Sequence, residues 1–218
     1  ALHHAMANGG HEAVAIALIG NGAQVNAKTG HGETALHYAI TLGARENIIR
    51  LLIKRGADID ARDIHGWTPL LMAAKKKRED TIKILLTRGA NIQATDNCGR
   101  TMLHHLVQDR APISLIHLVI NNGIDLNAKD DSGQTVLHLA VGARQLDVIT
   151  LLLENRADIQ LASKDGMTPL HTAIDQSNVN EAVVSLLLDS GADVAVRTAE
   201  GEQALHISAA RGHEKVLD

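Results

Sequence analysis

The chain has 218 residues, a formal net charge of −4 and an apolar fraction of 45%. This mild negative charge does not favour binding to nucleic acid or to an acidic lipid surface. The sequence contains no run of about 18 apolar residues, so it does not predict a membrane-spanning helix. The single cysteine, Cys98, excludes an internal disulfide framework and fits a reducing compartment, so we expect an intracellular, cytoplasmic location. With one Trp, one Tyr and no Phe, the core must consist of aliphatic side chains and alanine.

One short phrase recurs along the whole chain. Its fullest copy is GMTPLHTA at 166–173, and related copies begin at Gly32, Gly66, Gly99, Gly133 and Gly201. The threonines of successive copies, such as Thr34, Thr68 and Thr101, follow one another at a nearly constant interval. A second landmark, Gly-Ala-Asp or a relative, closes each repeat, and the interval from it to the next Thr position never changes. All variation in length therefore falls between the Thr and the closing glycine, which predicts a rigid connector and an adjustable link between two helices.

Each repeat is predicted to contain two short helices. In the first full repeat, Thr34 is the expected N-cap of a helix over Ala35–Thr41, and Asn47–Lys54 carries the broad apolar face of a second helix. Gly56 ends that helix as a residue that readily adopts positive φ, whereas Arg156 occupies the equivalent position in a later repeat and predicts local strain. The other second helices are predicted at Glu12–Gly20, Asp80–Thr87, Ile113–Asn121, Leu146–Glu154 and Glu181–Asp189, and the last repeat stops inside its second helix at 214–218.

A period of about 33 residues that carries T-P-L-H-x-A is typical of the ankyrin repeat, and the chain resembles an ankyrin array from end to end. The resemblance implies an all-α repeat solenoid of stacked helix–turn–helix repeats, joined by β-hairpin-like connectors and presenting a concave binding face. Because each repeat buries its apolar face against its neighbours, we expect a single domain over 1–218. We predict full repeats at 29–62, 63–95, 96–129, 130–162 and 163–197, with partial repeats at 1–28 and 198–218.

The sequence contains no recognisable catalytic, cofactor or metal motif. Six of its thirteen histidines share one repeat position, namely His3, His37, His104, His138, His171 and His206. They therefore form a ladder instead of a cluster, and the resemblance implies that they hydrogen-bond the connectors. His11-Glu12 and His213-Glu214 each lack the second histidine of H-E-x-x-H, and there is neither a phosphate-binding loop nor G-x-S-x-G. We expect no enzyme activity, no cofactor and no metal.

Two asparagines stand at a connector position that some ankyrin arrays present to an asparaginyl hydroxylase. These are Asn26 and Asn127. The resemblance implies hydroxylation as one interpretation, and hydrogen bonding within the turn is the other.

Ankyrin arrays usually bind other proteins through the concave side, which consists of connector tips and first helices. Transferred by position, the candidate partner-binding residues are Ile64, His65, Trp67, Lys75, Lys76, Arg100, Gln108, Asp131 and Asp175. Ile64 and Trp67 are apolar where solvent exposure is expected, and the only basic run, at 75–78, follows them. Such a combination is typical of a binding hot spot. Alternatively, the cations merely suit the end of a helix and Trp67 covers the neighbouring connector.

The expected charge of this side changes along the chain. It is basic in the third repeat and acidic further on, with Asp130, Asp131, Asp165 and Asp175. This pattern suits a protein or peptide partner better than nucleic acid.

Two hypotheses for the function remain open. The array is an interaction module that acts as a monomer, or it is an accessory or regulatory array of a larger enzyme, receptor or channel that packs mainly on its own chain. The sequence begins inside a repeat without an initiator Met, so we expect a piece of a longer chain.

Overall fold

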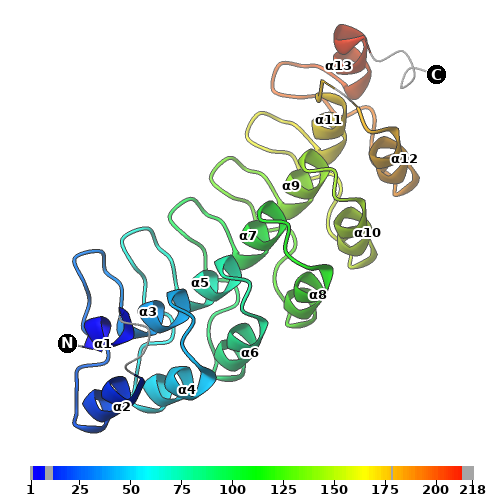
Figure 1. Ribbon diagram of the computed structural model, residues 1–218. Helices are drawn as coiled ribbons and strands as arrows, with labels where there is room; N and C mark the ends of the chain where they lie inside the picture. The colour runs from blue at the N-terminus through cyan, green and yellow to red at the C-terminus, as the bar shows by residue number, and fades with distance from the viewer. Residues whose placement is uncertain (1, 8–11, 178, 213–218) are drawn as a thin grey trace. The chain divides into compact units, whose positions relative to one another are not determined.

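A computed structural model describes residues 2–7, 12–177 and 179–212 (Figure 1). Within these residues the regular structure is helical, apart from one isolated bridge between Thr95 and Thr101. This confirms the expected all-α repeat fold. The helices are α1 (Leu2–Ala7), α2 (Glu12–Gly20), α3 (Ala35–Thr41), α4 (Glu46–Lys54), α5 (Pro69–Lys75), α6 (Glu79–Thr87), α7 (Met102–Gln108), α8 (Ile113–Asn121), α9 (Val136–Gly142), α10 (Leu146–Glu154), α11 (Pro169–Ile174), α12 (Glu181–Asp189) and α13 (Ala204–Arg211). The second helix expected at 214–218 lies outside the described residues.

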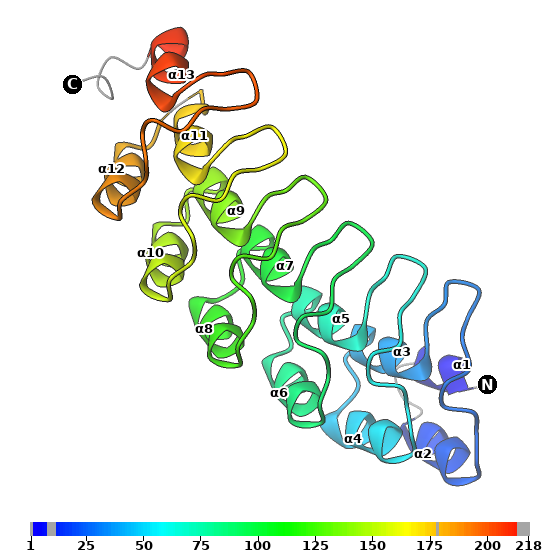
Figure 2. The same cartoon turned by 180° about the vertical axis from the view of Figure 1, so that it is seen from behind.

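The chain divides into two compact units, Ala1–His105 and Leu106–Asp218, whose boundary falls inside α7. In the first unit α1, α3 and α5 form a row of first helices, and α2, α4 and α6 form a row of second helices packed against it (Figure 1). In the second unit α9, α11 and α13 form the first-helix row, and α8, α10 and α12 form the second. Figure 2 shows that the connectors of each unit extend past its first-helix row, on the side away from its second helices.

The first helices begin as the sequence predicts. Thr34 is the N-cap of α3 with an extended backbone, at φ −94° and ψ 171°. In the next repeat the Leu71 N–H donates to Thr68 Oγ1 at 3.2 Å, and Pro69 occupies the first helical position, where no backbone N–H is needed. These features fix the start of each helix at the end of its connector.

The core lies between the two helices of each repeat and between neighbouring repeats. Leu36 and Ile40 of α3 are fully buried, as are Ile49 and Leu52 of α4. Each such side chain contributes about 1.5–3 kcal/mol to the stability of the folded state through burial. The core therefore consists of thin aliphatic layers, as the composition predicts.

Neighbouring connectors are joined at their tips by backbone hydrogen bonds. Within each connector the chain turns back on itself, so that the Asp63 N–H donates to Trp67 O at 3.0 Å. Between connectors, the Ile64 N–H donates to His31 O at 3.1 Å and the Asn97 N–H to His65 O at 2.9 Å. The second unit repeats the arrangement between Lys164 and Ser132. This ladder accounts for the constant connector length, because an added residue would displace each donor from its acceptor.

The turn glycine of the connector is required by this close approach. Gly133 has φ +75°, and a Cβ built on it would lie 2.7 Å from Lys164 N, inside the next connector. Any side chain there would force the two tips apart.

The observed ends of α3 and of the second helices α2, α4, α6, α8, α10 and α12 lie within one residue of the predicted ends. Two second helices begin one residue before their predicted start, at Glu46 and Glu79, because an acidic residue is favoured in the first turn beside unpaired N–H groups. Gly56 adopts φ +83°, as expected of the residue that ends α4. Arg156 adopts φ +66° without being glycine, which confirms the strained position that the sequence predicts.

Candidate functional site

The repeated histidines connect each first helix to the connector that follows it. His37 Nδ1 accepts a hydrogen bond from the Thr34 N–H at 3.2 Å, and its Nε2 donates to Trp67 O at 3.0 Å. His138 bonds in the same way to the Thr135 N–H, at 3.1 Å, and to Met167 O, at 2.9 Å. His3 Nε2 contacts Glu33 O at 3.1 Å. These contacts are the structural role that the resemblance implies for this ladder.

In His37 and His138 one neutral tautomer, with the proton on Nε2, satisfies both bonds. Burial lowers the pKa of His37, His138 and His171 below the ordinary value of an imidazole. These three histidines are therefore held neutral to a lower pH than an ordinary imidazole and contribute to stability.

One repeat carries an additional buried histidine that the sequence analysis does not single out. His105 on α7 lies four residues after Thr101, where Tyr38 and Leu139 occupy the equivalent positions of other repeats. Its Nε2 donates to Asp96 Oδ2 at 2.9 Å, and the two side chains are only 6% and 7% exposed. The ring of Trp67 packs against the imidazole, with ring centroids 4.4 Å apart and an angle of 36° between the planes.

Asp96 joins this contact to the connector of the fourth repeat. Its Oδ1 accepts hydrogen bonds from the Cys98 N–H at 2.8 Å and the Arg100 N–H at 3.0 Å. Burial lowers the pKa of His105, and the like charges of Lys75 and Arg100 act in the same direction, while the Asp96 carboxylate opposes the shift. Trp67, His105 and Asp96 thus form one packed group between the third and fourth repeats.

The first unit contains six of the nine predicted partner-binding residues. Ile64 is 52% exposed, and His65, Lys75 and Lys76 are also exposed. Trp67 and Arg100 are half-buried. Trp67 faces solvent only in part, and its ring covers His105 on the first helix of the next repeat.

The remaining three predicted residues lie in the second unit. Gln108 and Asp131 are exposed. Asp175 is half-buried and accepts hydrogen bonds from Arg211 at 2.5 Å and 3.1 Å, so its charge is compensated within the chain.

Two charged residues of the expected binding side have internal roles. Asp130 is buried and its Oδ1 accepts from the Ser132 N–H at 2.9 Å and the Gln134 N–H at 3.0 Å, so its assignment to an acidic tip is wrong. Arg78, the last residue of the basic run, donates to Ala44 O at 2.7 Å in the preceding repeat. The solvent-facing basic run is therefore limited to 75–77.

A family model described as ankyrin repeats in three copies matches residues 2–96, 89–163 and 156–218. The chain belongs to the ankyrin-repeat family. Its structure is similar to the crystal structure of the ankyrin repeat domain of Bcl-3, a unique member of the IkappaB protein family, with a TM-score of 0.82 and 26% identity over 94% of this chain and 92% of that chain. No curated protein matches the sequence. Ankyrin repeats generally mediate protein–protein interaction, and the family and fold are non-enzymatic interaction modules.

The two asparagines singled out in the ankyrin connectors bond to the next repeat. Asn26 Nδ2 donates to Gly56 O at 2.8 Å, and its Oδ1 accepts from the Asp58 N–H at 2.7 Å. Asn127 Oδ1 accepts from the Asp158 N–H at 2.8 Å. These side-chain bonds join consecutive repeats and do not lie within the turn, where hydrogen bonding was expected. Hydroxylation of either residue stays an untested prediction.

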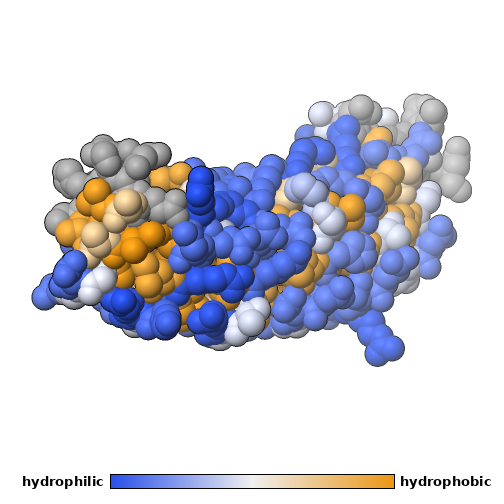
Figure 3. Space-filling model, turned by 60° about the horizontal axis from the view of Figure 1, so that its bottom comes forward, coloured by the Kyte–Doolittle hydropathy of each residue, from blue (hydrophilic) through white to orange (hydrophobic). Residues whose placement is uncertain are grey.

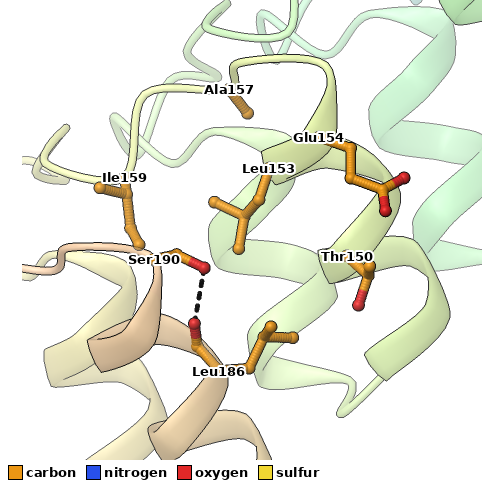
Figure 4. Close-up of a pocket in the computed structure, with 7 residues that line it drawn as sticks. All are labelled: Thr150, Leu153, Glu154, Ala157, Ile159, Leu186 and Ser190. Atoms are coloured by element: carbon orange, nitrogen blue, oxygen red, sulfur yellow. Dashed lines mark hydrogen bonds between the residues drawn. The ribbon is translucent and has the colours of Figure 1, made fainter.

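The second ankyrin unit contains an open pocket of about 420 Å³ between α10 and α12. It is lined by Thr150, Leu153, Glu154, Ala157, Ile159, Leu186 and Ser190 (Figure 4). The hydrogen bond drawn there, from Ser190 Oγ to Leu186 O at 2.7 Å, lies within α12. Convergent buried polar groups, which fix a small ligand in its site, are not found among these seven residues. We therefore do not assign a ligand to this pocket.

Exposed apolar side chains also occur on the second-helix rows of the array. Figure 3 shows hydrophobic surface over α2, where Val14 and Ile16 are exposed. Neither residue lies on a connector tip or a first helix, which distinguishes them from Ile64.

Among the described residues no group of three or more His, Cys, Asp or Glu side chains has a geometry that could hold a metal ion. In the same part of the chain, no helix is both long and apolar enough to cross a membrane.

Proposed function

We propose that the array binds a partner protein or peptide through the side made of connector tips and first helices, which is the concave side of ankyrin arrays. The observation that carries the proposal is the placement of Trp67. A large aromatic side chain remains partly exposed while its ring is held against His105. Trp, together with Arg, is the residue type that dominates binding energy at protein interfaces, especially where it is held in place before binding.

The proposed site is centred on the third and fourth repeats. Ile64, His65, Lys75, Lys76 and Arg100 surround Trp67 in sequence position and belong to the same unit. Gln108, Asp131 and Asp175 lie in the second unit and stay candidates for partner binding there, with Asp175 the weakest because Arg211 already pairs with it.

Affinity capture from a matched cell lysate tests the proposal. The parent chain is compared with Trp67→Ala and with Leu146→Ala, a control that removes an exposed apolar side chain from a second helix. We expect a partner that the parent and Leu146→Ala retain and that Trp67→Ala loses. Equal retention by all three chains would place binding elsewhere, and retention of nothing would favour an accessory array that packs on its own chain.

The remaining features of the proposal follow the sequence analysis. We propose that the chain is one ankyrin domain without enzyme activity, that it acts as a monomer in the cytoplasm, and that nucleic acid is not its partner. The mild net charge of −4 supports the last point.

A further inference from the structure

The outward side of α2 differs in composition from that of the other second helices. Its second, fifth and ninth residues are Ala13, Ile16 and Gly20, which share one side of the helix because they lie three and four positions apart. The corresponding residues of the other second helices are polar with one exception, namely Asn47, Arg50 and Lys54 in α4, Asp80, Lys83 and Thr87 in α6, Ser114, His117 and Asn121 in α8, Asp147, Thr150 and Glu154 in α10, and Ala182, Ser185 and Asp189 in α12. Only α2 therefore lacks a polar side chain at all three of these positions.

The exposed surface of α2 is apolar throughout. Val14 is 45% exposed and Ile16 is 42% exposed. Helical geometry places these two side chains on opposite borders of the exposed surface, with the exposed residues Ala13, Ala17 and Gly20 between them. Residues 13–20 include no polar side chain, and a helix that is apolar all round is typically covered on every side.

This surface is held in place by the neighbouring elements. α2 packs against α1 and α4. Arg55, which follows α4, donates from Nη1 to Ile19 O at 2.7 Å, and Asn21 Nδ2 donates to Ala17 O at 2.8 Å. A ligand that binds α2 does not have to order this helix first, which lowers the entropic cost of binding.

Another repeat stacked before α2 in the regular register would cover only part of this surface. Val14 is the third residue of its helix, and the equivalent residues Ile48 and Thr81, which do have a preceding repeat, are buried. Arg50 and Lys83, at the position of Ile16, have the same preceding repeats, and their side chains nevertheless remain 49% exposed. Such a repeat would therefore bury Val14 and leave Ile16 in water.

We infer that α2 binds an amphipathic helix of a partner protein, which lies along α2 and places large apolar side chains between Val14 and Ile16. The inference goes beyond the proposed function, because it assigns a second interaction surface away from the connector tips. Ala13, Ala17 and Gly20 allow a helix axis to approach closely.

A helix suits this surface better than an extended segment does. A helix satisfies its own backbone N–H and C=O groups, whereas an extended segment would bury such groups against side chains that offer no hydrogen bond. The matching partner carries apolar anchors spaced three and four residues apart, with polar residues on the opposite face.

A second copy of the chain and a lipid surface are the competing occupants. Two arrays joined only through α2 would fall short of the roughly 20–30 residues that each side of a stable interface contributes, whereas reversible binding of one helix requires only a few anchors. Helices that lie on a lipid surface usually carry Lys and Arg beside their apolar face, and α2 contains neither.

A displayed library of random helix-forming peptides of about 15 residues, selected on the whole chain, tests the inference. We expect the selected peptides to carry large apolar residues at helical spacing. One of them, made synthetically with a fluorescent label, should bind with an affinity that changes little with salt concentration and should become more helical on binding, as measured by circular dichroism. Ile16→Arg should weaken its binding at least tenfold, because a cation replaces an apolar anchor.

Ile16→Arg should not disturb folding. The next repeat has Arg50 at this position, paired with Glu46 four residues earlier, and Glu12 precedes residue 16 by the same interval. Ser185→Arg is the matched control, since Ser185 is the exposed fifth residue of α12 and the substitution adds the same charge. We expect the control to change peptide affinity less than threefold.

Each other outcome contradicts a definite part of the inference. Equal losses in Ile16→Arg and Ser185→Arg would reduce the effect to net charge, and selected peptides that gain no helicity would contradict a helical partner. Peptides that lose binding with Trp67→Ala but not with Ile16→Arg would contradict the site on α2 and support the proposed function. Failure to select any peptide above background would also contradict the inference, while the lysate capture would still decide the proposed function.

Further measurements identify a different occupant of α2. Sedimentation that shows a dimer of the parent and a monomer of Ile16→Arg would replace the partner with a second copy. Binding to vesicles of phosphatidylcholine and phosphatidylserine that Ile16→Arg abolishes would replace it with a lipid surface. A longer natural chain that cannot bind the peptide would show that a segment of the same protein covers α2.

Discussion

His105 donates a hydrogen bond to Asp96 at 2.9 Å from beneath the ring of Trp67. The bond connects the first helix of the fourth repeat to the connector that precedes it. Through Trp67, it also connects that helix to the end of the preceding connector. A change at any one of the three residues should therefore be detectable at the other two.

Asp96→Ala should destabilise the chain by about 3 kcal/mol, because it removes the acceptor of one side-chain and two backbone donors. Asp63→Ala is the matched control, since Asp63 also accepts from two backbone N–H groups but Met72 stands where the fourth repeat has His105. We expect the control to cost less by roughly 1–2 kcal/mol. Urea unfolding measures both values, and equal losses would show that the bond to His105 contributes nothing.

Trp67→Ala should raise the pKa of His105. Burial is the largest cause of its lowered pKa, and the Trp67 ring covers the imidazole. Proton NMR titration of the His105 ring measures this pKa in both chains. The pKa of His138, in the other unit, serves as the internal reference and should not move. A His105 pKa that stays low without the Trp67 ring would show that other groups bury the imidazole.

The array should lose stability as the pH falls below about 6.5. In the unfolded chain the ladder histidines bind a proton near that pH, whereas the folded chain holds His37, His138 and His171 neutral to a lower pH. Between the two pKa values the unfolded state binds more protons, so the free energy of unfolding decreases with falling pH and levels off below the folded pKa. Urea midpoints from pH 8 to pH 5 measure the effect.

The substitution His138→Leu removes one histidine of this ladder and so tests its contribution alone. Leu71 occupies the same position in the third repeat and is fully buried there, so leucine fits the site. The variant should be less stable at pH 8 by about 1–3 kcal/mol, because the Thr135 N–H loses its acceptor and Met167 O keeps only the bond from the Ser163 N–H. Its stability should nevertheless depend less on pH than that of the parent. An unchanged pH dependence would assign the acid sensitivity to other groups.

Arg156→Gly should raise the free energy of unfolding by about 1 kcal/mol, because Arg156 holds a left-handed conformation at φ +66° that glycine adopts without strain. Arg144→Gly is the comparison. Arg144 is also left-handed, at φ +55°, but its Nε donates to Gln176 Oε1 at 2.7 Å in the next repeat. It should gain less, since the substitution removes that bond. A midpoint for Arg156→Gly that is no higher than that of the parent would contradict the strain.

Much of the fold can be read from the sequence because the repeat fixes both spacing and packing. Thr34 identifies the start of α3, and the recurring histidine identifies the bond to the connector. The sequence is less informative about side chains that meet across repeats. Trp67 and His105 are separated by more than one full repeat, and their contact depends on a substitution that breaks the pattern at one position of one repeat.

The buried connector carboxylates could have been found from the sequence. The first residue of each turn is Thr29, Asp63, Asp96, Asp130, Ser163 or Thr198, and every one of these side chains offers an oxygen. Such residues accept hydrogen bonds from backbone N–H groups two to four positions later, as Asp130 does. Counting Asp130 as surface charge overlooked this regularity. The exposure of Ile64, by contrast, follows directly from its tip position.

Three long cationic side chains of the connectors, Lys28, Arg62 and Lys129, reach one repeat further along the chain. Lys28 donates to Arg62 O at 3.1 Å, Arg62 in turn to Thr95 O at 2.7 Å, and Lys129 to Ala162 O at 2.7 Å. Donor and acceptor are separated by 34, 33 and 33 residues, the same interval as the repeat. If one whole repeat were removed or duplicated, each of these donors would therefore still meet a backbone carbonyl at the equivalent position of the next repeat. Whole repeats can therefore be gained or lost during evolution while the same hydrogen bonds form between the repeats that remain.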